Sequence, residues 1–117
     1  MKHDGYYLGA PSSYIDYVAG NNKRTGIIHS AYLFTENGVV KRRSKETKDE
    51  IVGFKKEDFE NAHSGEYTTK EDFLYVIFDK NQKWEVRITF KLNEDQMVCI
   101  ESNTVAGAGQ IYEFHKF

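Results

Sequence analysis

Hydrophobic and polar residues alternate without a break along residues 83–92, KWEVRITFKL. Successive side chains of a β-strand point to opposite faces of a sheet, so a period of two residues predicts a strand with one buried face. The large side chains that share this face are Trp84, Val86, Ile88, Phe90 and Leu92. We expect them to cover either a solid core or a hollow that holds an apolar molecule.

Strand signals of this kind recur along the chain. The clearest is residues 27–43, IIHSAYLFTENGVVKRR, in which two apolar runs flank Asn37-Gly38. Asn and Gly tolerate the positive φ of tight hairpin turns, so this segment predicts a β-hairpin. Turn residues at 80–82 and 93–95 separate three further runs and predict an antiparallel meander. The run 110–117, QIYEFHKF, follows a flexible loop at 105–109 and is expected to be the closing strand.

Helical signals are few. Residues 54–62, FKKEDFENA, favour a helix of one or two turns if Phe54 and Phe59 are packed against another element. Residues 11–19 are compatible with a short helical turn that begins at Pro11 and, equally, with a strand at 14–18.

About eight strand candidates in one small domain favour a closed sheet, because closure removes the unpaired backbone groups of sheet edges. The predicted fold is all-β: a single antiparallel meander barrel of roughly eight strands with one or two short helices. One domain is expected to span residues 1–117, since no linker or repeat divides the chain. An open α+β sheet with one covering helix is the alternative fold.

Four short motifs resemble the small bacterial lipocalin-like (calycin-like) barrels. They are Asp4-Gly5-Tyr6-Tyr7, Tyr32-Leu33-Phe34 with the turn at Asn37-Gly38-Val39, Gly65-x-Tyr67, and Tyr112-x-Phe114. The resemblance covers most of the chain, although Tyr7 replaces the tryptophan of the lipocalin opening motif Gly-x-Trp. It implies an antiparallel barrel with an internal cavity, in a group of proteins that mostly have no assigned activity.

Bulky residues dominate the expected inner face of the barrel. The candidates are Tyr32, Phe34, Tyr67, Leu74, Val76, Phe78, Trp84, Val86, Ile88, Phe90, Leu92, Met97, Cys99 and Ile111. Side chains of this size fill most of a short barrel and leave at most a shallow pocket at one mouth, with a larger apolar cavity as the alternative. The expected ligand-binding residues are Tyr32, Tyr67, Trp84 and Phe90, with Arg42 placed to meet a carboxylate at the mouth.

The run 73–78, FLYVIF, is apolar on both faces, whereas a strand with one solvated face should alternate. Its second face therefore needs a cover. One candidate is the helix expected at 54–62. The other is a partner protein or a second copy of the chain, with an interface at Phe73, Tyr75 and Ile77.

Composition and charge narrow the classes of function. The 117-residue chain carries a net charge of −2, so we expect neither a nucleic-acid nor a membrane partner. Cys99 is the single cysteine, which excludes an intramolecular disulfide. With neither a signal-peptide core nor a run of roughly 20 apolar residues, the chain is expected to be cytoplasmic, or exported with its signal removed.

Candidate chemistry is sparse. None of the four histidines, at positions 3, 29, 63 and 115, has the spacing of a metal-binding pair, so neither a metal nor a cofactor is expected. Acidic pairs lie beside lysines in turns, and no nucleophile motif is present, which favours a non-enzymatic protein. The leading hypothesis is a barrel that binds a small apolar or amphipathic ligand in its interior. The alternative is a protein-interaction or homodimerising module that acts through the outer face of residues 73–78.

Overall fold

A single antiparallel sheet contains all nine strands found in residues 1–18, 22–104 and 108–117, the part of the chain that the computed structural model describes. Its strand order is β1-β9-β8-β7-β6-β5-β4-β3-β2. The strands are β1 (Gly5–Gly9), β2 (Ser12–Val18), β3 (Asn22–Phe34), β4 (Val39–Thr47), β5 (His63–Lys70), β6 (Phe73–Phe78), β7 (Val86–Asn93), β8 (Gln96–Ser102) and β9 (Ile111–Lys116). One 3₁₀ turn, η1 (Lys56–Phe59), precedes β5.

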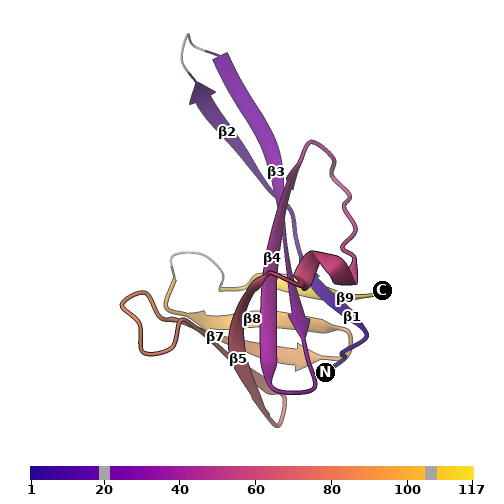
Figure 1. Cartoon of the computed structure of the whole chain (residues 1–117), viewed down its shortest axis with the longest axis vertical. Helices are drawn as coiled ribbons and strands as arrows, with labels where there is room; N and C mark the ends of the chain where they lie inside the picture. The colour runs from indigo at the N-terminus through magenta and orange to yellow at the C-terminus, as the bar shows by residue number, and fades with distance from the viewer. Residues whose placement is uncertain (19–21, 105–107) are drawn as a thin grey trace.

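Pairing between β1 and β3 closes this sheet into a barrel. Tyr7 lies opposite Tyr32, and Leu8 lies opposite Ala31. Eight strands form the closed barrel, and β2 remains outside it (Figure 1). The predicted all-β antiparallel barrel is thus confirmed, and the open α+β alternative is wrong.

Turns joining the strands follow the sequence signals. Between β3 and β4, Gly38 has a φ of 80°, and the amide of Thr35 donates to the carbonyl of Val39 at 2.9 Å. Asn81, before β7, and Glu94, between β7 and β8, have positive φ values of 63° and 54°. The predicted hairpin and the meander are both confirmed. Residues 105–107 of the loop expected before the last strand lie outside the described residues.

The barrel interior is filled by alternate residues of its strands. Its buried core contains Tyr7, Tyr32, Phe34, Val40, Leu74, Val76, Phe78, Ile88, Phe90, Met97, Cys99 and Tyr112, with Tyr67, Val86 and Leu92 among the half-buried residues packed against it. Every residue that the alternation placed on the inner face belongs to this core or packs against it, except Trp84 and Ile111. Of the two expectations, a mostly filled barrel and a barrel with a larger apolar cavity, this buried core agrees with the first.

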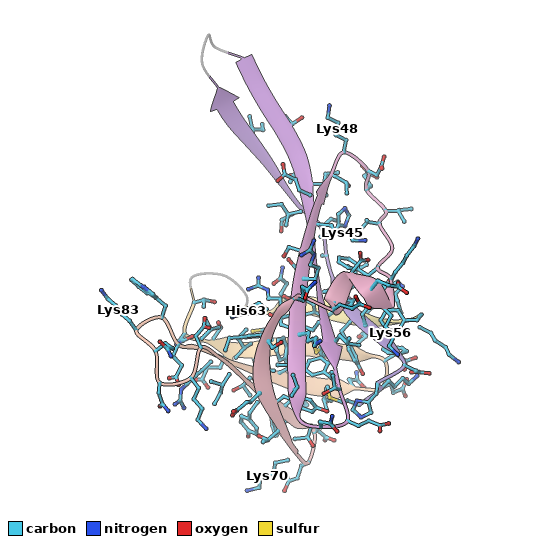
Figure 2. All side chains as sticks on the ribbon, viewed as in Figure 1. Lys45, Lys48, Lys56, His63, Lys70 and Lys83 are labelled. Atoms are coloured by element: carbon cyan, nitrogen blue, oxygen red, sulfur yellow. The ribbon has the colours of Figure 1, made fainter. Side chains whose placement is uncertain are left out.

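Trp84 was expected inside the barrel, but its side chain is 76% exposed. The strand begins only at Val86, and the preceding loop is closed by hydrogen bonds from the amide of Gln82 to the carbonyl of Asp79 and from the amide of Glu85 to the carbonyl of Gln82. Figure 2 shows Lys83, the neighbour of Trp84, on a loop that projects from the barrel. The alternation therefore continues beyond the end of the strand, where it no longer determines burial.

Ile111 is the second error, with 46% of its side chain exposed. In β9 the opposite parity faces inward, because Tyr112 lies across from Met97 of β8 and is buried.

A second apolar cluster lies on the outside of the barrel. Tyr6, Ala31 and Leu33 pack there against Phe54 and Phe59. The amide of Phe54 donates to the hydroxyl of Tyr6 at 3.2 Å in a buried hydrogen bond, which fixes the segment before η1 on β1. The helix expected at 54–62 is thus a single 3₁₀ turn, and it does not cover β6.

Beyond the barrel, β2 and residues 22–26 of β3 form a two-stranded extension, which we call the arm. Pairing of β3 with β4 ends at Ile27 opposite Thr47, whereas pairing with β2 continues to Val18 opposite Asn22. The arm accordingly projects along the long axis of the molecule, which measures 52 Å (Figure 1). Of the two expectations for residues 11–19, the strand is confirmed and the helical turn is wrong over 12–18; residue 19 lies outside the described residues.

Candidate ligand-binding cavity

A cavity of about 350 Å³ lies at one end of the barrel. Its lining includes the first residue of β7, the last residue of β8 and the start of β9, so it opens where these strand ends meet. We call it the mouth cavity. It is lined by Tyr32, Arg42, Val86, Ile88, Phe90, Cys99, Ser102, Thr104, Gln110 and Tyr112.

Three aromatic rings form the floor of the mouth cavity. The ring centres of Tyr32 and Tyr112 are 5.3 Å apart, and both rings lie 5.7 Å from Phe90. All three pairs are edge to face, the arrangement in which the positive edge of one ring meets the negative face of another. Since each of the three side chains is buried, the floor is fixed by the barrel core itself.

Arg42 lies on the wall of the mouth cavity beside this floor. It is opposite Tyr32 in the register of β3 and β4, and its guanidinium carbon is 5.9 Å from the centre of the Tyr32 ring. Within the described part of the chain, no acidic side chain forms an ion pair with Arg42. Arg87, by contrast, is neutralised by Glu85 at 2.9 Å on the outside of the barrel. Arg42 therefore brings an unneutralised positive charge to the cavity.

The phenol groups of the floor are held in their neutral form. Burial raises the pKa of Tyr32 and of Tyr112, and the positive charge of Arg42 offsets part of this effect in both. The Tyr112 hydroxyl donates to the side-chain oxygen of Gln110 at 3.0 Å. Burial also raises the pKa of the Cys99 thiol. At neutral pH the cavity thus combines an uncharged aromatic floor with one cation.

Two of the five predicted ligand-binding residues lie elsewhere. Tyr67 faces inward but stands near the turn between β3 and β4, where its hydroxyl donates to the carbonyl of Thr35 and its ring meets Phe34 edge to face at 5.1 Å. Trp84 lies on the outer surface. The structure brings together Tyr32, Phe90 and Arg42.

Sequence reasoning missed four residues that line the mouth cavity: Ser102, Thr104, Gln110 and Tyr112. Tyr112 is the one that belongs to the aromatic floor. The last strand has two parities, and the expected one contained Ile111. The sequence did contain a signal for the correct parity. Tyr112 and Phe114 are two residues apart, so both aromatic rings lie on the face opposite to that of Ile111. Both belong to the barrel core or pack against it.

The predicted interface residues lie on the outer face of β6. Tyr75 is 41% exposed, and Phe73 and Ile77 are half-buried. Ile77 lies between two surface grooves, one of about 630 Å³ that Trp84 also lines and one of about 330 Å³ that Tyr75 also lines. This face departs from the alternation of exposed polar residues expected for a solvated strand, because Phe73, Tyr75 and Ile77 are all apolar or aromatic.

Histidine and acidic side chains form no group of three or more potential metal ligands among the residues described. His29 is buried and its Nε2 donates to the carbonyl of Asp49 at 3.0 Å, which gives it a structural role between β3 and the loop that follows β4. His63 stacks on Phe78, with its Nε2 3.3 Å from a carboxylate oxygen of Asp79.

Comparisons of the chain with protein families, curated proteins and solved structures found no match. The resemblance to lipocalin-like barrels stays a prediction. Within residues 1–18, 22–104 and 108–117, no helix has the length and hydropathy needed to cross a bilayer.

Proposed function

We propose that the protein binds a small amphipathic molecule in the mouth cavity, with its apolar part on the aromatic floor and an acidic group directed at Arg42. The observation that carries this proposal is the position of an unneutralised guanidinium beside three buried rings. The proposal is one of binding alone and assigns no reaction to the site.

The size and lining of the mouth cavity support a ligand of modest size. Its volume of about 350 Å³ is near the lower end of the range of small-molecule sites, about 300–1,000 Å³. Val86 and Ile88 extend the apolar surface of the floor, and Ser102 and Gln110 supply polar groups. Because the rest of the barrel is filled, the ligand would sit at the mouth and keep its polar end near solvent.

Arg42 supports an acidic group on the ligand. A guanidinium presents a planar fork of donors that matches a carboxylate or sulfonate, and such charge-assisted hydrogen bonds contribute about 1.5–3 kcal/mol. Because no described acidic side chain forms an ion pair with Arg42, a ligand would not have to break an existing ion pair in order to bind.

Two fluorescent probes test the proposal. Anilinonaphthalene sulfonate has an aromatic body and an anionic group, and N-phenyl-1-naphthylamine has the same body without the charge. Arg42→Met should weaken binding of the sulfonate about tenfold or more and leave binding of the amine nearly unchanged. Arg43→Met is the matched control, because Arg43 is the next residue on β4 and has the opposite parity. Equal effects of the two substitutions, or absence of saturable binding, would contradict the proposal.

A second candidate function is protein interaction through the outer face of β6. The observation that favours it is the exposure of Tyr75 and Trp84 on either side of Ile77, with η1 packed elsewhere. Exposed apolar patches of this kind are typical of interfaces. Tyr75→Lys should abolish association and change thermal stability little. Ile111→Lys is the control for added charge, because Ile111 is similarly exposed, at 46% against 41% for Tyr75, and lines neither groove. Loss of folding in Tyr75→Lys would assign this residue to the core instead.

A further inference from the structure

Among the described strands, those of the arm are the ones with backbone edges that pair with no neighbouring strand. Each strand of the closed barrel has a partner on both sides, but β2 pairs with β3 alone among the described strands. The outer edge of β2 is therefore open along Ser12–Val18. Residues 22–26 of β3 likewise have no partner among the described strands on the edge where β4 has ended.

The open edge of β2 has few of the features that protect sheet edges. Such edges normally carry lysines, prolines or bulges that prevent another strand from pairing. The sequence of β2, SSYIDYV, contains one charged residue, Asp16, and neither lysine nor proline. Ile15, at the centre of the strand, is 64% exposed. In addition, a two-stranded ribbon is marginally stable by itself, and three or more strands are needed for independent stability.

We propose that the arm pairs with the arm of a second copy of this chain, β2 against β2, around a two-fold axis at Ile15. The result is a four-stranded sheet in the order β3-β2-β2-β3. This inference is independent of the ligand proposed for the mouth cavity.

The register of this pairing argues for a second copy. Ile15 is the middle residue of Ser12–Val18, so antiparallel pairing over the full strand sets Ile15 of one copy opposite Ile15 of the other. Tyr14 then faces Asp16 and Ser13 faces Tyr17, so no like charges lie directly opposite each other. A β-branched pair at the axis is favourable across strands, and the two edges match in length because they are identical.

Cysteine cross-linking tests the register. Directly opposite residues have Cβ atoms about 4.5–5.5 Å apart, close to the separation of a disulfide. Ile15→Cys should therefore form a covalent dimer under mild oxidation. Ser13→Cys is the matched control, since residue 13 is exposed, has the same parity as residue 15, and would lie about 13 Å from its counterpart. Wild type, with Cys99 buried, gives the baseline.

Sedimentation of untreated protein gives the second readout. Wild type should dimerise reversibly, and Ile15→Lys should weaken the dimer about tenfold or more, because it places two like charges opposite each other. The barrel should fold normally in this variant, since β2 lies outside it. A wild type that is monomeric at every concentration would overturn the proposal. Equal cross-linking at positions 13 and 15, or a dimer abolished by Tyr75→Lys and unaffected by Ile15→Lys, would also overturn it.

Discussion

Tyr32 and Arg42 are direct neighbours across β3 and β4, with the Arg42 guanidinium carbon 5.9 Å from the centre of the Tyr32 ring. The turn at Gly38 sets this register, because it places Phe34 opposite Val40 and thus Tyr32 opposite Arg42. A local hairpin signal in the sequence therefore determines where the positive charge of the mouth cavity lies.

Two aromatic residues should differ sharply in their contribution to stability. Phe34 is fully buried, so Phe34→Ala should lower the free energy of unfolding by about 3–5 kcal/mol. Trp84 is mostly exposed, and Trp84→Ala should change the same quantity by about 0.5 kcal/mol or less. Urea unfolding followed by circular dichroism measures both. If Trp84→Ala lowered the free energy of unfolding by more than Phe34→Ala does, the indole would belong to the core.

This contrast shows what the alternation pattern can and cannot predict. The inner face of β7 was identified correctly from Val86 to Leu92, because the period of two residues determines which face a side chain occupies. The alternation did not identify where β7 begins. Pairing with β6 stops at Phe78 opposite Val86, although the alternation continues back to Trp84. Beyond that point, hydrogen bonds of the loop, such as that from the Asn103 side-chain amide to the carbonyl of Glu85, determine the position of Trp84.

Gly5 should be intolerant of any side chain. A Cβ atom at this position would lie 2.1 Å from the carbonyl oxygen of His115 and 2.7 Å from the Phe114 ring. Gly5→Ala should therefore push β1 away from β9 and cost about 1–3 kcal/mol or more. Gly53→Ala is the control, because no atom lies within 4 Å of the corresponding Cβ. Equal melting temperatures for the two variants would argue against the pairing that closes the barrel.

Stability should fall at alkaline pH. Burial raises the pKa of Tyr112 and of Tyr32 above the ordinary value of 10.0. Above pH 10 the unfolded chain therefore binds fewer protons than the folded one, and the free energy of unfolding decreases by up to about 1.4 kcal/mol per pH unit for each such group. Below pH 10 their stabilisation is fully present. Tyr112→Phe should flatten the decline, and an unchanged slope would mean that Tyr112 titrates alike in both states.

Cys99 should report occupancy of the mouth cavity. Its side chain is 3% exposed and its thiol pKa is raised by burial, so reaction with methyl methanethiosulfonate should be much slower in the folded protein than in urea. Because Cys99 lines the cavity, saturating anilinonaphthalene sulfonate should slow the reaction further. Saturable binding of the probe without protection of Cys99 would place the ligand elsewhere.

Part of the candidate site could be predicted from the sequence. Alternation along the predicted hairpin and meander gave the inward faces of Tyr32 and Phe90, and Arg42 was expected at the mouth. Tyr67 was also predicted correctly to face inward, but it stands away from the mouth cavity. Parity determines the face of a residue, whereas its height along the barrel depends on the stagger between strands, which no single strand encodes.

The central claim is that a ligand binds on the aromatic floor beside Arg42. The most direct measurement is a titration of ¹⁵N-labelled protein with anilinonaphthalene sulfonate, followed by amide and side-chain NMR shifts. We expect saturable shifts at Tyr32, Phe90, Tyr112 and the Arg42 guanidinium, with the Trp84 indole signal unmoved. Shifts concentrated at Trp84 and Ile77, or shifts that never saturate, would contradict it.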